Sequence, residues 1–163
     1  MSDDPIKDAL KMIPYGFYSI TSRNGDTRNV MVANWLMQTS FEPRQVALGL
    51  AKKAYSHGLI TDGEAFVVNI FKKADAETIK PFSKSHAKNP DKFNDVHYSD
   101  GPETGVPVLD EAAAYLECKV VGRLDAGGDH EIIVGEVVGA GVRKAGEPTD
   151  TLTLPDLGWS YAG

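Results

Sequence analysis

Apolar and polar residues alternate along most of the chain in the pattern of β-strands. Six segments alternate in this way or form short apolar runs between turn residues, and we expect strands at 17–22, 28–33, 45–51, 64–71, 113–124 and 131–142. Asn24-Gly25-Asp26 predicts a tight hairpin turn, and the glycines within 125–129 predict a second turn. Helical spacing is confined to three short segments, 6–13, 55–61 and 74–80, and we expect Pro81 to end the last of them.

Six or seven strands with few helices predict a mainly β fold, an antiparallel barrel, rather than a parallel sheet wound with helices. Gly135, Gly139 and Gly141 lie within a predicted strand, at a spacing that does not match a nucleotide-binding glycine motif. The length of 163 residues fits one domain over residues 1–163. We expect the tail, 152–163, to dock on the body or on a partner.

The stretch from 72 to 94 differs from the rest of the chain in composition. It is rich in Lys, Ser and Asp, and only Ile79, Phe82 and Phe93 are evident apolar anchors. We interpret it as an excursion from the barrel whose lysines form a solvated surface.

Overall composition is that of an ordinary globular protein, with 42% hydrophobic and 25% charged residues. No apolar run reaches the roughly 20 residues that span a bilayer, and the N-terminus lacks a signal-peptide pattern, so we expect a cytoplasmic protein that does not insert in a membrane. A net charge of −6 argues against nucleic-acid binding. The single cysteine, Cys118, excludes an internal disulfide, and we interpret it as a core thiol.

Candidate chemistry gathers on both sides of the strand at 45–51. One face of that strand is unusually small, Ala47, Gly49 and Ala51, and permits close approach of a ligand or of backbone. Lys52 and Lys53 follow it, and then Tyr55 and Ser56 open a predicted helix. Ammonium and hydroxyl groups beside a helix N-terminus favour an anion, and the alternative is a solvated charged turn.

Before the same strand lie two polar pairs. The Asn34 amide can donate to and accept from the polar edge of a heteroaromatic ring, while Trp35 can equally be a core residue. Thr39 and Ser40 are a second pair, with turn capping as the alternative.

The histidines offer no metal site. They form no His-x-x-x-His pair and no Cys/His cluster, which excludes the common metal motifs. His130 follows a Gly-Asp pair at a predicted strand start, and its local sequence favours a solvated loop histidine over a catalytic one.

Three motifs resemble those of the flavin reductase-like, FMN-binding split-barrel family. The first is A-N-W-L-M-Q-T-S-F-E-P followed by V-A-L-G-L-A-K-K-A-Y-S, within 33–56. The others are F-V-V-N-I-F at 66–71 and G-D-H-E-I-I-V-G-E-V at 128–137. The resemblance extends from Pro14 to about Val142.

The resemblance implies a Greek-key split β-barrel that forms a homodimer, with FMN, in preference to FAD, held near the subunit interface. It also implies a role for each matching residue. The segment Asn34, Trp35, Leu36 and Met37 lies along the flavin ring, Thr39 and Ser40 contact ribityl or phosphate oxygens, and Lys52, Lys53, Tyr55 and Ser56 surround the phosphate. Ala51 is a further cofactor-binding position. His130 lies near the flavin face where a nicotinamide stacks, and is the residue assigned to catalysis.

Three functions follow as hypotheses. The first is an NAD(P)H:flavin oxidoreductase that transfers hydride from a nicotinamide to flavin and serves a monooxygenase or another redox protein. The second is an FMN-containing electron carrier that is reduced by a protein partner without turning over NAD(P)H. The third is a binding module that kept the barrel and lost the cofactor. An absorbance spectrum of the purified protein, with NADH and NADPH added anaerobically, separates them.

Overall fold

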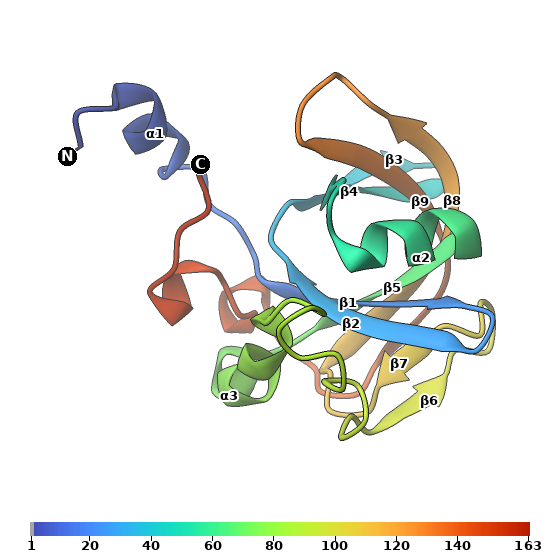
Figure 1. Cartoon of the computed structure of the whole chain (residues 1–163). Coiled ribbons are helices and arrows are strands. Elements are labelled where there is room, and N and C mark those ends of the chain that lie inside the picture. The colour runs from blue at the N-terminus through green and yellow to red at the C-terminus, as the bar shows by residue number, and fades with distance from the viewer. Residues whose placement is uncertain (1) are drawn as a thin grey trace.

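The computed structural model describes residues 2–163, and its main element is one curved antiparallel sheet of seven strands (Figure 1). Its strands are β1 (Tyr18–Asn24), β2 (Thr27–Ala33), β3 (Leu36–Phe41), β4 (Arg44–Ala51), β5 (Ala65–Ile70), β8 (Ala114–Leu124) and β9 (His130–Val142). They are hydrogen-bonded in the order β2-β1-β5-β8-β9-β4-β3. The predicted mainly β, split-barrel fold is confirmed.

The barrel is open between its two edge strands. Among residues 2–163, β2 and β3 do not pair with each other, although they are consecutive in the chain. Only Asn34 and Trp35 separate them, so this dipeptide crosses the opening. The sequence analysis predicted that Asn34 and Trp35 follow the end of a strand, which is confirmed. The order of the strands shows in addition that this strand end lies at the opening of the barrel.

The main core lies between the strands and helix α2 (Tyr55–Gly63), which sits across the barrel in Figure 1. The fully buried members of this core are Ile20, Leu48, Leu50, Ile60, Phe66, Val68, Cys118 and Ile133. Burial raises the pKa of the Cys118 thiol to about 12, with the neighbouring Glu117 adding to the shift, so Cys118 is the inert core thiol that its sequence position predicts.

A second core cluster attaches the excursion and the tail to the barrel. Ile79 and Phe82 from the excursion pack with Phe17, Phe71 and Leu109, and Leu152 and Leu154 from the tail join them. Phe93 is partly buried against the same cluster, so all three predicted anchors of the excursion are confirmed. The tail docks on the body as expected.

The remaining elements are short. They are α1 (Pro5–Leu10), α3 (Ala76–Ile79), the two-stranded sheet of β6 (Tyr98–Asp100) and β7 (Pro107–Leu109), and the 3-10 helices η1 (Lys73–Asp75), η2 (Lys80–Ser83), η3 (Pro148–Asp150) and η4 (Pro155–Leu157). Asp4 caps α1 by accepting hydrogen bonds from the backbone of Ile6 and Lys7. In Figure 1, α1 stands away from the barrel, near the C-terminus.

One prediction about local structure was wrong. The sequence analysis gave no strand at 36–41, but β3 occupies this range, and Thr39 and Ser40 lie within it rather than capping the turn, which is formed by Glu42 and Pro43. The reason is that β3 is an edge strand with most positions exposed, so it lacks apolar alternation. The expected end of the helix before Pro81 is confirmed, because α3 ends at Ile79 and Pro81 lies in the first turn of the 3-10 helix η2, where its missing N–H has no consequence.

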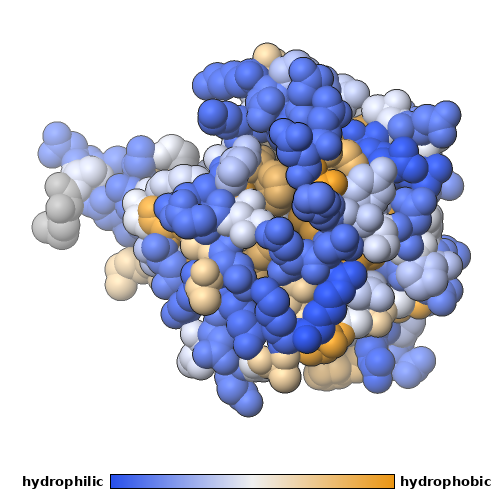
Figure 2. All heavy atoms as spheres, turned by 90° about the horizontal axis from the view of Figure 1, so that it is seen from below, coloured by the Kyte–Doolittle hydropathy of each residue, from blue (hydrophilic) through white to orange (hydrophobic). Residues whose placement is uncertain are grey.

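The molecular surface is largely hydrophilic on the face drawn in Figure 2, with small apolar areas between the polar side chains. Among residues 2–163, no helix has the length and apolar character needed to cross a bilayer.

Candidate functional site

The dipeptide that crosses the split of the barrel lies against the small face of β4. The backbone N–H of Gly49 donates to the Trp35 carbonyl oxygen over 2.8 Å. A Cβ at position 49 would lie 3.0 Å from the Trp35 Cβ, so glycine is what allows the indole to pack on the strand. The close approach that the small face predicts is therefore observed, with Trp35 as the approaching group.

His130 begins β9 directly beside the end of β4, where Ala51 is its register partner. Its ring lies 4.5 Å from the Trp35 ring, centroid to centroid, and its side chain is 20% exposed. The interpretation of His130 as a solvated loop residue was wrong, because register with β4 draws the ring onto Trp35.

Both nitrogens of the His130 ring have hydrogen-bond partners. Nδ1 lies 2.7 Å from an Asp129 carboxylate oxygen, and Nε2 lies 2.9 Å from the Tyr161 hydroxyl. The hydrogen bond with His130 holds the pKa of Asp129 below its usual value. Burial, with the Asp129 charge nearby, raises the pKa of Tyr161. Tyr161 also meets Trp35 edge-on at 4.9 Å, so the tail forms one wall of this site.

These aromatic residues surround a cavity of about 340 Å³, which we call the ring cavity. Its lining includes Ala33, Asn34, Trp35, Gly49, Ala51, His130 and Tyr161. Two of its lining residues each carry a buried donor, Asn34 Nδ2 and Trp35 Nε1, that has no hydrogen-bond partner within residues 2–163. Buried donors are rarely left unpaired, so these two atoms fit a flat ligand whose edge carries hydrogen-bond acceptors, as the flavin ring does.

A second cavity, of about 570 Å³, opens at the N-terminus of α2, and we call it the anion cavity. Lys53, Tyr55 and Ser56 line one side. The Ser56 hydroxyl is buried and accepts a 2.8 Å hydrogen bond from Asn29 Nδ2. Ala54, the N-cap residue, makes no side-chain capping bond, so the N–H groups of Tyr55 and Ser56 remain able to bind an anion, while that of His57 donates to the Ala54 carbonyl oxygen over 3.0 Å.

The excursion forms the other side of the anion cavity, with Ser83, Lys84, Ser85, His86 and Lys92. The His86 ring stacks on the Tyr55 ring at 3.7 Å with an angle of 7° between the planes. Met31, Val32, Ser83 and Tyr161 line both cavities, which are therefore adjacent parts of one site.

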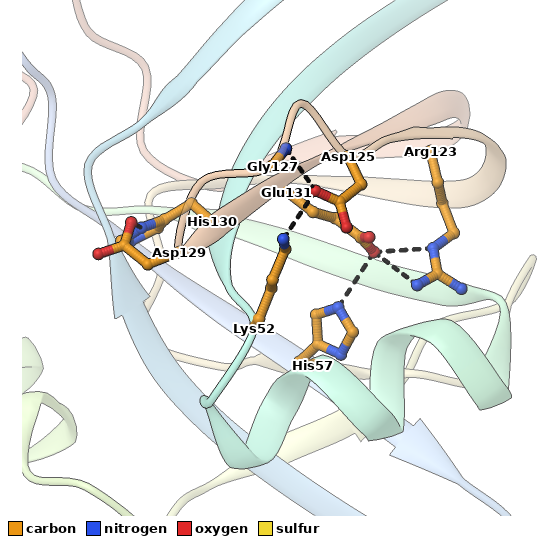
Figure 3. A network of polar contacts seen from close by, with 8 residues as sticks. All are labelled: Lys52, His57, Arg123, Asp125, Gly127, Asp129, His130 and Glu131. Carbon is orange, nitrogen blue, oxygen red and sulfur yellow. Dashed lines mark hydrogen bonds and ion pairs between the residues drawn. The ribbon is translucent and has the colours of Figure 1, made fainter.

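The adjacent residues Lys52 and Lys53 face different surroundings. Lys52 Nζ lies 2.7 Å from an Asp125 carboxylate oxygen, which also accepts a hydrogen bond from the Gly127 N–H (Figure 3). Lys53 lines the anion cavity. The structure thus places one lysine of the predicted phosphate site in the cavity and pairs the other with a carboxylate.

A separate ion-pair network lies to the right of Lys52 in Figure 3. The Glu131 carboxylate, 6% exposed, accepts a 2.7 Å hydrogen bond from Arg123 Nε and lies 3.0 Å from His57 Nε2. The hydrogen bond from Arg123, joined by His57, holds the pKa of Glu131 below its usual value against the opposing effect of burial.

This shift predicts a pH dependence of stability. Because the pKa of Glu131 is lower in the folded protein, its contribution is complete above about pH 4.3, the ordinary glutamate pKa, and is lost as the pH falls through the folded value. We expect Glu131→Gln to lower the free energy of unfolding by about 1–2 kcal/mol at pH 7, and by progressively less as the pH falls below about 4.3. Urea unfolding over a series of pH values measures this. Glu42→Gln, in the exposed β3–β4 turn, is the control, and an effect of Glu131→Gln that does not decline as the pH falls contradicts the assignment.

Several residues implied by the resemblance lie outside the two cavities. Leu36 and Met37 line a separate cavity that shares Trp35 and Gly49 with the ring cavity. Thr39 and Ser40 lie on β3 near Gln45, six residues from Ala51 along β4, or roughly 20 Å at the rise of a strand. Within one chain, therefore, Thr39 and Ser40 do not reach the anion cavity.

The sequence analysis missed other residues of the site. Asn29, Lys92 and Tyr161 are brought in by β2, the excursion and the tail, and no local motif marks them. The interpretation of the excursion's lysines as solvated was wrong for Lys92, which is 9% exposed. The signal available was its neighbour Phe93, an anchor that holds this segment against the barrel.

Comparison with known proteins identifies the family. The model of the flavin reductase like domain matches residues 10–158. Diflavin flavoprotein A 1 of a Synechocystis species is 33% identical over 144 residues, which are 88% of this chain and 25% of that protein. High molecular weight rubredoxin of Moorella thermoacetica is 34% identical over 142 residues, 86% of this chain and 61% of that protein.

A solved structure agrees with these sequence matches. The NADH:FAD oxidoreductase SgcE6 of Streptomyces globisporus superimposes with a TM-score of 0.74 and 29% identity, over 82% of this chain and 79% of that one. The chain is shorter than the two relatives above, and spans 25% and 61% of their lengths. The resemblance read from the three sequence motifs is confirmed, and the chain belongs to the flavin reductase-like domain family.

Proposed function

We propose that the protein binds FMN in the joined ring and anion cavities and acts as an NAD(P)H:flavin oxidoreductase. One observation carries the proposal. A cavity with aromatic walls and two unpaired donors adjoins a cavity with lysines and hydroxyls at a helix N-terminus. This arrangement suits a ligand with a flat polar ring at one end and a phosphate at the other.

Within this proposal, the chain's residues bind and orient. Asn34 Nδ2 and Trp35 Nε1 donate to the edge of the ring, and Gly49 and Ala51 leave room for its face. Lys53, Ser56 and the first-turn amides of α2 hold the phosphate. FMN is favoured over FAD because the His86–Tyr55 stack borders the phosphate end, where FAD would need room for its adenosine half. The bound flavin supplies the redox chemistry.

His130 serves in this proposal as a positioning group at the edge of the ring cavity. Its hydrogen bonds to Asp129 and Tyr161 fix the plane of its ring against Trp35. A nicotinamide beside the flavin would contact this imidazole. Hydride transfer requires no general base, so orientation is the function that we assign to it.

A second candidate is an electron carrier reduced by a protein partner. The observation that favours it is the Tyr161 hydroxyl on His130 Nε2, because the tail then covers the side from which a nicotinamide would approach. The similarity to a diflavin flavoprotein and to a high molecular weight rubredoxin points the same way. A redox-protein or monooxygenase acceptor fits either candidate.

A homodimer belongs to the same proposal. Ile13, Met37 and Ile132 are 46%, 66% and 40% exposed and line an apolar cavity behind Trp35. A second copy on this face would cover these side chains and bring the flavin near the interface. Leu36 and Met37 would then contact the flavin ring at this interface. Apolar exposure of this kind marks a contact surface.

The test is an anaerobic absorbance spectrum of the purified protein with added FMN, followed by NADH and NADPH, with sedimentation of the same sample. We expect oxidised-flavin bands that bleach with a nicotinamide, on a species of dimer mass. Bands that persist with both nicotinamides and disappear with dithionite favour the electron carrier. A protein that takes up no FMN contradicts both candidates, and a monomer contradicts the dimer.

A further inference from the structure

The excursion places a buried lysine, Lys92, on the lining of the anion cavity and also of a neighbouring cavity of about 420 Å³ whose lining includes Asp91, Asp95 and Glu111. Lys92 is 9% exposed, although lysine is among the residues least often buried. Its Nζ donates to the backbone carbonyl oxygen of Lys84 over 2.8 Å and lies 3.5 Å from that of Phe82. Within residues 2–163 no carboxylate forms an ion pair with it.

A buried ammonium with only carbonyl partners is costly, because neither hydrogen bond neutralises its charge. Burial accordingly lowers the pKa of Lys92. Phe82 before Lys92 and Phe93 after it pack against the second core cluster, so the backbone on both sides of Lys92 is anchored to the barrel.

The other charged side chains that line the anion cavity are also positive. Lys53 and Lys84 line it together with Lys92, His86, Ser56, Ser83 and Ser85, and no aspartate or glutamate occurs among its described lining residues. The chain as a whole carries a net charge of −6, so this local excess of cations is opposite to the overall balance. Three ammonium groups, three hydroxyls and helix N-terminal amides together match a phosphate monoester, which carries nearly two charges and three acceptor oxygens.

We propose that Lys92 recognises the phosphate of the bound ligand, and that the excursion from Lys80 to Lys92 is the second half of the phosphate site rather than a surface decoration. The first half is the N-terminal turn of α2 with Lys53 and Ser56. The phosphate lies between the two halves and supplies the counter-charge that Lys92 lacks. This inference rests on the proposed function, because it takes the ligand to be a phosphorylated one.

Two phosphates share this chemistry, the one on FMN and the 2′-phosphate of NADPH. The experiment therefore has two arms, each comparing a ligand with its counterpart that lacks this phosphate. Dissociation constants of FMN and riboflavin are measured in the first arm, and those of NADPH and NADH in the second. Each is measured for the wild-type protein and for Lys92→Met, Lys92→Arg and Lys88→Met. Lys88 is an exposed lysine of the same segment and does not line the cavity.

We expect the wild-type protein to prefer FMN to riboflavin, and Lys92→Met to reduce this preference by about 10-fold or more, the effect of one charge-assisted hydrogen bond. Lys92→Arg keeps the charge and most of the preference, and Lys88→Met changes neither. Met fits a buried position, and the thermal midpoint without ligand verifies that the variant folds.

If Lys92→Met reduces the preference for NADPH over NADH but not the preference for FMN over riboflavin, the site binds the 2′-phosphate of NADPH. This result also supports Lys92 as the residue that recognises the phosphate. A phosphate preference that is absent in both arms, or that survives in Lys92→Met, overturns the inference. A wild-type protein that binds neither flavin defeats the proposed function but not this inference, because the NADPH arm still measures it.

Discussion

Replacing Lys53 with methionine is expected to weaken FMN binding by roughly 10- to 100-fold, because one hydrogen bond between an ammonium and a phosphate contributes about 1.5–3 kcal/mol. Lys53 lines the anion cavity beside the N-terminal turn of α2. Its side chain is exposed on the other side, so the substitution leaves the core unchanged. Quenching of FMN fluorescence on titration with the protein measures the dissociation constant.

The adjacent residue is the matched control for this prediction. Lys52→Met removes the same charge one position earlier, from a lysine whose ammonium lies 2.7 Å from the Asp125 carboxylate rather than in the cavity. We expect its effect on the FMN dissociation constant to stay within about twofold, as for an exposed ion pair. Equal losses in the two variants would mean that general electrostatic attraction, and not a specific contact, holds the phosphate.

Replacing Phe66 with alanine is expected to lower the free energy of unfolding by about 3–5 kcal/mol, a large share of the stability of an ordinary domain. Phe66 is fully buried in the main core. A Cβ at Gly135 would lie 2.7 Å from its Cζ atom, so the ring already fills the space down to the β9 backbone, and its loss leaves a cavity that the strands cannot close. Urea denaturation with linear extrapolation measures the change.

Phe41→Ala is the control, because this ring is 86% exposed on the edge strand β3. We expect it to change the free energy of unfolding by no more than about 0.5 kcal/mol. Measuring both variants again after tenfold dilution separates folding from assembly, since only a contribution from a subunit contact depends on protein concentration. A similar loss in both variants would show that the main core is not where the structure places it.

The two cavities account for why part of the site was predictable. Lys53, Tyr55 and Ser56 are local to one strand end and one helix start, and a helix N-terminus marks an anion site in sequence as well as in space. Asn34 and Trp35 were recognisable as the end of a strand. That Asn34 Nδ2 and Trp35 Nε1 are buried donors without partners could be found only from the structure, because it depends on which atoms pack around each of them.

Other parts of the site depend on contacts between distant segments. Lys52 and Lys53 are adjacent residues of the same type, and the sequence does not distinguish them. They differ because Asp125, in the turn between β8 and β9, forms an ion pair with Lys52. Tyr161 reaches His130 across 31 positions of sequence. Thr39 and Ser40 carry the right chemistry but stand at the other end of β4. Spacing along the chain carries no information about any of these distances.

The sequence by itself determined the strand pattern, the split-barrel family, the core position of Cys118 and the helix start whose residues line the anion cavity, because alternation, turn residues and helix starts are local properties. Tertiary structure decided which charges remain available to a ligand. It neutralised Lys52, buried Lys92 among carbonyl groups and placed the tail's Tyr161 on His130. The physical reason is that the environment of a charge is set by whatever packs against it, and here those partners come from segments that are remote in sequence.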